Sequence, residues 1–258
     1  TAVWDPVGKR ALIFGGKYSY APLKELWMYT PSTGKWDRRA DAPLGHIYHT
    51  AVWDTKHGQM IVYGGYDQLA YLEGVYIYNL SADTWTWINQ ASSGPGPRAH
   101  HSAVWDELNN VMIVLGGDYY DGSVHHSLDD VWTYEPETNK WTNIGKAPTT
   151  RYDGQGVWDN AHERMLVIGG WITYNTANPD DWSYYLRTRK FTVLPGLYPL
   201  GLDMTAVWDR ENNQVLTFGG AVIRSYRSSF LQPGTLTASG HLLSVDFYSI
   251  EKVDFRRF

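Results

Sequence analysis

The sequence predicts an all-β fold built from five copies of one four-stranded antiparallel unit. Three observations support this prediction: a Val-Trp-Asp motif recurs, a Gly-Gly pair follows each copy, and no segment shows helical periodicity. Each motif tryptophan precedes the first glycine of its pair by 11 residues. The glycine pairs begin at Gly15, Gly64, Gly116, Gly169 and Gly219, at steps of 49, 52, 53 and 50 residues. The repeating unit is therefore about 50 residues long and fills the chain.

The elements of one unit follow in a fixed order. The first strand is expected at the motif itself, as in residues 49–53, and the motif aspartate opens a tight turn after it. Short apolar runs that end in Gly-Gly, such as residues 60–63, are typical of second strands buried on both faces. Alternating runs such as residues 75–78 predict third strands, and a turn such as residues 30–34 leads to a fourth.

An aromatic pair separated by nine residues joins the third and fourth strands in the first four units. The pairs are Trp27 and Trp36, Tyr76 and Trp85, Trp132 and Trp141, and Trp182 and Phe191. The fifth unit lacks this spacing, and we expect its outer half to be irregular. Repeated four-stranded units of this length predict the blades of a β-propeller.

The Gly-Gly pair followed by a spaced aromatic pair resembles the kelch repeat of the galactose-oxidase-like kelch superfamily, over essentially the whole chain. The resemblance implies a single kelch-type β-propeller domain over residues 1–258. Five four-stranded blades are visible. Their approximate ranges are residues 1–40, 47–90, 99–144, 152–194 and 203–256. Because kelch propellers more usually have six or seven blades, the resemblance leaves open whether five blades close the ring or form part of a larger one.

Composition excludes several classes of site. The 258 residues carry a net charge of −5 without a basic stripe, which argues against nucleic-acid binding. No apolar run is long enough for a membrane helix, so membrane insertion is not expected. Cysteine is absent, which excludes disulfides, thiolate nucleophiles and Cys-ligated metals, and leaves the compartment undetermined.

Length variation predicts a binding face. Connections from second to third strands and from fourth to first strands vary in length, and in an up-and-down blade both emerge on one face. These loops are rich in aromatic side chains, which suit protein interfaces and also stack on sugars. The candidate partner-binding aromatics are Tyr18, Tyr20, Tyr66, Tyr71, Tyr119, Tyr120, Trp171 and Tyr174. The alternative is that they pack the loops against neighbouring blades.

Polar residues just before the first strands form a second candidate set. His46, Arg98 and Arg151 stand seven residues before a motif tryptophan, and His49 and His101 stand four before. First strands are innermost in a propeller, so we expect these residues around the mouth of the central channel. The resemblance to kelch adaptor proteins implies a peptide pocket in which Arg98 and Arg151 clamp a carboxylate. The alternative is that they pair with blade carboxylates or backbone carbonyls and so stitch the blades together.

Catalytic signals are weak. Galactose oxidase, the best known kelch enzyme, needs a Cys–Tyr cofactor that a chain without cysteine cannot form. Asp118, Asp121, His125 and His126 make the only compact cluster of metal-ligand type. Kelch proteins of the plant specifier class bind iron with a Glu, Asp, His set, but Gly117 stands at the glutamate position here. No metal or cofactor is therefore predicted, and a metal-assisted lyase or hydrolase is kept only as an alternative.

The sequence thus predicts a non-catalytic module for protein–protein interaction. Its long-loop face would hold the partner. Two alternatives use the same fold: a carbohydrate-binding propeller, and an architectural extracellular subunit of a larger assembly.

Overall fold

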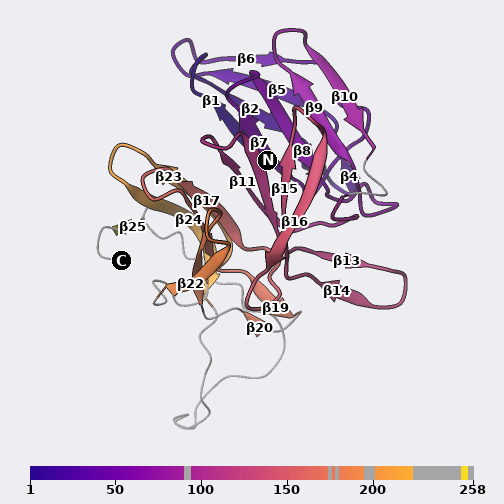
Figure 1. Ribbon diagram of the computed structural model, residues 1–258. Coiled ribbons are helices and arrows are strands. Elements are labelled where there is room, and N and C mark those ends of the chain that lie inside the picture. The colour runs from indigo at the N-terminus through magenta and orange to yellow at the C-terminus, as the bar shows by residue number, and fades with distance from the viewer. Residues whose placement is uncertain (90–93, 174–175, 178–179, 195–200, 223–250, 255–258) are drawn as a thin grey trace, which may run out of the picture.

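The computed structural model describes residues 1–89, 94–173, 176–177, 180–194, 201–222 and 251–254. These residues form antiparallel strands and contain no helix, which confirms the all-β prediction (Figure 1). No helix among them is long and apolar enough to span a membrane.

Four complete blades account for most of the chain, and each has four antiparallel strands. Blade 1 contains β1 (Ala2–Asp5), β2 (Arg10–Phe14), β5 (Leu26–Thr30) and β6 (Lys35–Arg38). Blade 2 contains β7 (Thr50–Asp54), β8 (Gln59–Tyr63), β9 (Val75–Asn79) and β10 (Thr84–Ile88). Blade 3 contains β11 (Ser102–Asp106), β12 (Val111–Leu115), β15 (Asp130–Glu135) and β16 (Lys140–Lys146). Blade 4 contains β17 (Gln155–Asp159), β18 (Arg164–Ile168), β21 (Asp181–Tyr185) and β22 (Lys190–Leu194).

The fifth unit departs from the other four. Its sheet has three described strands: β23 (Gly201–Asp209), β24 (Gln214–Val222) and β25 (Glu251–Asp254). In blades 1 to 4 the second strand ends at the Gly-Gly pair, where both glycines have positive φ. In the fifth unit, by contrast, strand β24 continues through its glycine pair, and Gly219 pairs with Met204 of β23. The first strands β1, β7, β11, β17 and β23 lie side by side in chain order, and the sheets fan outwards from them (Figure 1).

Neighbouring blades pack through complementary faces. Trp53 of blade 2 belongs to one apolar cluster with Val3 and Leu12 of blade 1, and Trp105 joins Val52 in the same way. Both indoles are buried, whereas Trp4 is 48% exposed on a face of blade 1 that no other described blade covers. Trp53 and Trp105 therefore serve the scaffold by filling the space between blades.

Backbone hydrogen bonds also join the blades. In blades 1 to 3 the second glycine of the pair donates its N–H to a carbonyl of the next blade, as from Gly65 to Arg98 at 2.8 Å. The first glycine, Gly64, has φ +64, and a Cβ there would lie 2.5 Å from that same carbonyl oxygen. Glycine is needed at this point because the next blade approaches the backbone too closely for a side chain.

Candidate binding surface

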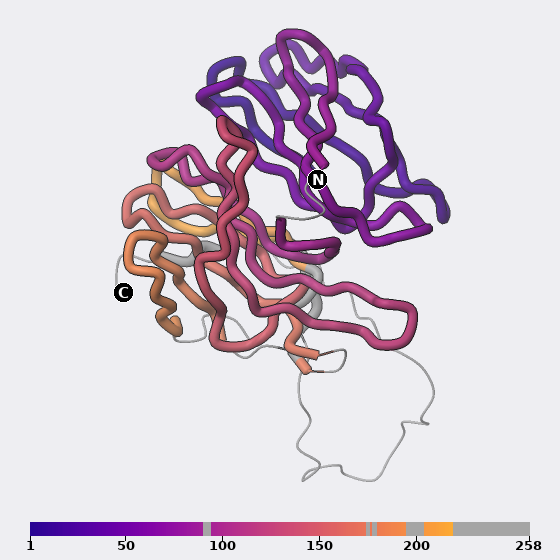
Figure 2. The backbone as a smooth tube through the Cα atoms, turned by 45° about the vertical axis from the view of Figure 1, so that its right-hand side comes forward, coloured from indigo at the N-terminus to yellow at the C-terminus, as the bar shows by residue number. Residues whose placement is uncertain are grey.

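Small hairpins follow the Gly-Gly pairs of blades 1 to 4. They are β3 (Lys17–Tyr18) with β4 (Ala21–Pro22), the Tyr66–Tyr71 bridge, β13 (Asp118–Tyr120) with β14 (His125–Ser127), and β19 (Trp171–Thr173) with β20 (Thr176–Ala177). In both overall views, β3–β4 and β13–β14 point to the same side of the molecule, and β13–β14 projects furthest from its blade (Figures 1 and 2). The variable loops therefore form ordered hairpins that leave the blades at the glycine pairs.

Large apolar side chains stand exposed on three consecutive hairpins. Tyr18 and Tyr20 are 78% and 85% exposed, Leu69 is 91% exposed, and Tyr120 and Val124 are 51% and 55% exposed. We call these five residues the hairpin surface. Three of them were predicted as contact residues, while Leu69 and Val124 were missed because an apolar residue in a loop is as often buried as exposed.

The other predicted aromatics support the hairpins. Tyr66 and Tyr71 are half-buried with ring centres 5.3 Å apart, and the Tyr66 hydroxyl donates to the Gln68 carbonyl at 2.8 Å. Tyr119 stacks on His126 at 4.6 Å. Half-buried Trp171 exchanges two backbone hydrogen bonds with Tyr152. Tyr174 lies outside the described residues. The contacts of Tyr66, Tyr71 and Tyr119 thus lie within their own hairpins, and Trp171 pairs with the segment before β17.

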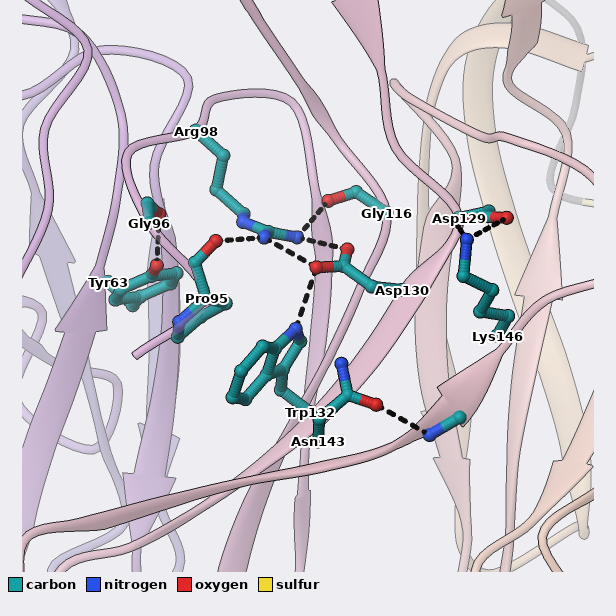
Figure 3. A network of polar contacts seen from close by, with 11 residues as sticks. Tyr63, Pro95, Gly96, Arg98, Gly116, Asp129, Asp130, Trp132, Asn143 and Lys146 are labelled. Atoms are coloured by element: carbon teal, nitrogen blue, oxygen red, sulfur yellow. Dashed lines mark hydrogen bonds and ion pairs between the residues drawn. The ribbon is translucent and has the colours of Figure 1, made fainter. Parts of the chain in front are cut away.

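Arg98 is buried within blade 3 (Figure 3). Its guanidinium donates to the Gly116 carbonyl at 2.8 Å, to the Pro95 carbonyl, and to both carboxylate oxygens of Asp130 at 2.7 and 2.9 Å. Burial acts to raise the pKa of Asp130, but the hydrogen bond and charge of Arg98 outweigh it and hold that pKa below its ordinary value. The Trp132 indole also donates to this carboxylate.

Arg151 plays the same part in blade 4. It is buried, donates to the Gly169 carbonyl at 2.7 Å and to the Asp180 carbonyl, and lies 3.8 Å from the ring centre of Trp182. Burial lowers the pKa of Arg151 to about 10. Both arginines therefore pair with a blade carboxylate or with backbone carbonyls, as the alternative interpretation describes, but the groups that each guanidinium joins belong to one blade rather than to two. A carboxylate clamp would require breaking these contacts, so neither arginine enters the binding surface proposed below.

The three predicted histidines are also buried. His46 Nδ1 donates to the Gly64 carbonyl at 3.1 Å, the same blade position that Arg98 and Arg151 reach at Gly116 and Gly169. Burial lowers the pKa of His46 to about 4 and places the pKa values of His49 and His101 well below the ordinary value. These rings are neutral at pH 7 and are part of the buried scaffold.

The residues five positions before the motif tryptophans are the accessible ones at the inner rim. Tyr48, His100 and Asp153 have φ values of +58°, +53° and +56°. Their backbones form a ladder between blades: His100 N–H donates to Tyr48 at 3.0 Å, and Asp153 N–H donates to His100 at 2.8 Å. Tyr48 is 46% exposed and its ring centre lies 4.2 Å from that of His100. We call these three the rim residues.

The cluster of metal-ligand type resolves into hydrogen-bonded pairs. The carboxylate of buried Asp118 accepts from His100 Nδ1 at 2.7 Å and from His125 Nε2. His126 Nε2 contacts Asp121 at 2.7 Å, and this bond, with two backbone N–H donors, lowers the pKa of Asp121 to about 2. Among the described residues, no three such side chains are placed to hold one metal ion. The cluster anchors the β13–β14 hairpin to the rim.

Comparisons with known proteins agree with this architecture. The family described as the KLHDC2/KLHL20/DRC7 Kelch-repeats domain matches residues 1–220. No curated protein matches the chain. Among solved structures, that of YjhT superposes with a TM-score of 0.70 at 17% sequence identity, over 86% of this chain and 73% of that one. At this identity the likeness shows the fold alone.

Proposed function

Because the chain belongs to the KLHDC2/KLHL20/DRC7 family of kelch-repeat domains, whose propellers are commonly protein-interaction modules, we propose that it binds another protein through the hairpin surface. The family is typically a non-catalytic interaction domain, in keeping with the absence of a recognisable catalytic motif in the sequence.

The exposure of the hairpin surface carries this proposal. Tyr18, Tyr20, Leu69, Tyr120 and Val124 lie at neighbouring hairpins and expose half or more of their side chains to water. Exposed apolar groups that gather on one face mark interaction sites. Tyrosine is a strong anchor in such interfaces because its rigid ring buries a large area while its hydroxyl keeps a polar partner.

Affinity capture from native extract, followed by mass spectrometry, tests the proposal. The test variant carries Tyr18→Ser, Tyr20→Ser and Tyr120→Ser. The matched control carries Trp36→Ser and Trp87→Ser, which alter two aromatics of similar exposure on the outer strands β6 and β10. We expect one protein to be captured by the wild type and the control and lost by the test variant. Equal capture by all three would contradict the proposal.

Carbohydrate binding and a purely architectural role stay alternative predictions. Exposed tyrosine rings also stack on sugars, so a glycan array with the same three proteins distinguishes this alternative from protein binding.

A further inference from the structure

We propose that Tyr48 is a contact residue at the centre of this binding surface, and that it receives an arginine guanidinium of the partner. The inference rests on the proposed function and extends it inwards from the hairpins to the rim. Three observations carry it: the backbone conformation of Tyr48, the exposure of its ring, and the groups that already lie against that ring.

The backbone at Tyr48 favours a residue without a side chain. Its φ of +58° lies in the left-handed region, where a bulky L-residue is an outlier and glycine is at ease. The ladder between blades imposes this conformation, since the Tyr48 carbonyl accepts from His100 N–H at 3.0 Å. Gly58 takes this conformation at the turn position that Lys9, Asn110, Glu163 and Asn213 hold in the other four units, so the repeat accepts glycine there as well as residues with a side chain. A glycine at position 48 would relieve the strain, and tyrosine is the bulkiest of the three rim residues that share this φ.

The Tyr48 ring contributes little to the core. It is 46% exposed and belongs to none of the apolar clusters formed by the described residues. Its neighbours are the His100 ring at 4.2 Å and Lys17, whose Nζ lies 3.5 Å from the hydroxyl and 5.8 Å from the ring centre. A strained residue that the core does not need points to a functional role for its side chain.

These neighbours indicate what the ring accepts. One is a planar ring that packs against it at an interplanar angle of 36°, and the other is a cation. A guanidinium combines both properties, because it is planar, charged and weakly hydrated. The carboxylate of Asp153, whose side chain is 31% exposed and lies 4.0 Å from His100 Nε2, adds negative charge at the same rim. A partner arginine would replace Lys17 on Tyr48, with the carboxylates of the rim favouring its charge.

A stability comparison tests the strain. Tyr48→Gly and Tyr48→Ala both remove the ring, but only glycine relieves the left-handed backbone. We expect Tyr48→Gly to melt about 2–4 °C above Tyr48→Ala. The matched pair Trp36→Gly and Trp36→Ala, at an exposed position within strand β6, should show the reverse order. A lower Tm for Tyr48→Gly than for Tyr48→Ala would overturn the argument from strain.

A comparison of peptide binding by variants tests whether Tyr48 receives an arginine of the partner. The probe is a random dodecapeptide library displayed on phage and panned on the wild type. We expect the selected peptides to share an arginine whose replacement by neutral citrulline weakens binding at least tenfold. Tyr48→Phe should retain the affinity, Tyr48→Gly should lose at least tenfold, and Lys17→Met should gain a fewfold by removing the competing cation. Peptides that bind Tyr48→Gly like the wild type, or that need no arginine, would overturn the inference.

The two proposals fail in different ways. Peptides that lose affinity for Tyr48→Gly but not for the triple hairpin variant would support the rim and contradict the hairpin surface. The opposite pattern would support the hairpin surface and overturn the role of Tyr48. Recovery of no binding peptide on the wild type would count against both.

Discussion

Arg98 and Asp130 form a two-pronged ion pair inside blade 3, with N–O distances of 2.7 and 2.9 Å. The pair joins the segment before β11 to the start of β15, and the same guanidinium reaches the Gly116 carbonyl at the end of β12. One buried cation therefore joins the segment before β11 to the ends of two strands of the blade, which explains why Arg98 is part of the scaffold.

Breaking this pair should destabilise the fold strongly. Arg98→Met leaves the Asp130 carboxylate without its cation, and we expect a loss of about 3–5 kcal/mol in the free energy of unfolding. The control is Arg210→Met, which removes an exposed pair with Glu107 and should cost less than about 1 kcal/mol. Urea denaturation measures both. Similar urea midpoints for the two variants would contradict the prediction, because they would show that the contacts of Arg98 contribute little to the stability of the fold.

Because neighbouring blades approach each other closely at only one of two glycines, we predict that replacing these glycines by alanine costs very different amounts of stability. Gly64 and Gly122 both have positive φ, but a Cβ at Gly64 would lie 2.5 Å from the Arg98 carbonyl oxygen, whereas one at Gly122 meets nothing within 4 Å. Gly122→Ala should therefore cost only the backbone term of about 1–2 kcal/mol. Gly64→Ala should lower the free energy of unfolding by more than this, because its Cβ also collides with the Arg98 carbonyl oxygen. Thermal unfolding of the two variants measures the difference. Equal losses would mean that the blades can shift apart freely.

The three buried histidines predict that the free energy of unfolding falls at acid pH. Unfolded histidine binds a proton near pH 6.5, while His46 in the fold does so only near pH 4, and His49 and His101 are also shifted well down. Between these values the unfolded chain binds more protons, so stability is greatest above pH 6.5 and falls as pH drops towards 4. Each histidine adds a slope of up to about 1.4 kcal/mol per pH unit.

Denaturation midpoints between pH 7.5 and 4.5 check this profile. His46→Gln keeps a donor for the Gly64 carbonyl without titrating, and should make the profile flatter than in the wild type. A profile of unchanged steepness in this variant would contradict the assignment of His46.

The hairpin surface should be dispensable for folding. Tyr18→Ser, Tyr20→Ser and Tyr120→Ser alter side chains that stand mostly in water, so each should change the free energy of unfolding by less than about 0.5 kcal/mol. Thermal unfolding of the triple variant provides the measurement. A large drop in Tm would show that these tyrosines pack the hairpins, as Tyr66 and Tyr71 do.

The repeat made the blades predictable, because a spacing that recurs with the same chemistry reflects contacts that every blade makes. The Gly-Gly pairs and the motif tryptophans are such contacts. The fifth unit was the exception: its aromatic spacing is lost, and its described sheet has three strands.

The candidate site was predicted less well, for a physical reason. Residue type does not tell which way a polar side chain turns at the entrance to a first strand. Arg98 and His46 turn inwards to a glycine carbonyl, while Tyr48, only two positions beyond His46, is held outwards by its left-handed backbone. Position in the repeat was the usable signal, since the rim residues share one register.

The affinity of the captured partner for the triple hairpin variant tests the central claim most directly. Calorimetric titration would compare the wild type with Tyr18→Ser, Tyr20→Ser and Tyr120→Ser, after equal Tm values show that both are folded. Loss of anchor tyrosines from an interface costs about 2 kcal/mol or more, so we predict at least a 30-fold weaker Kd. An unchanged Kd would show that the partner binds elsewhere on the propeller.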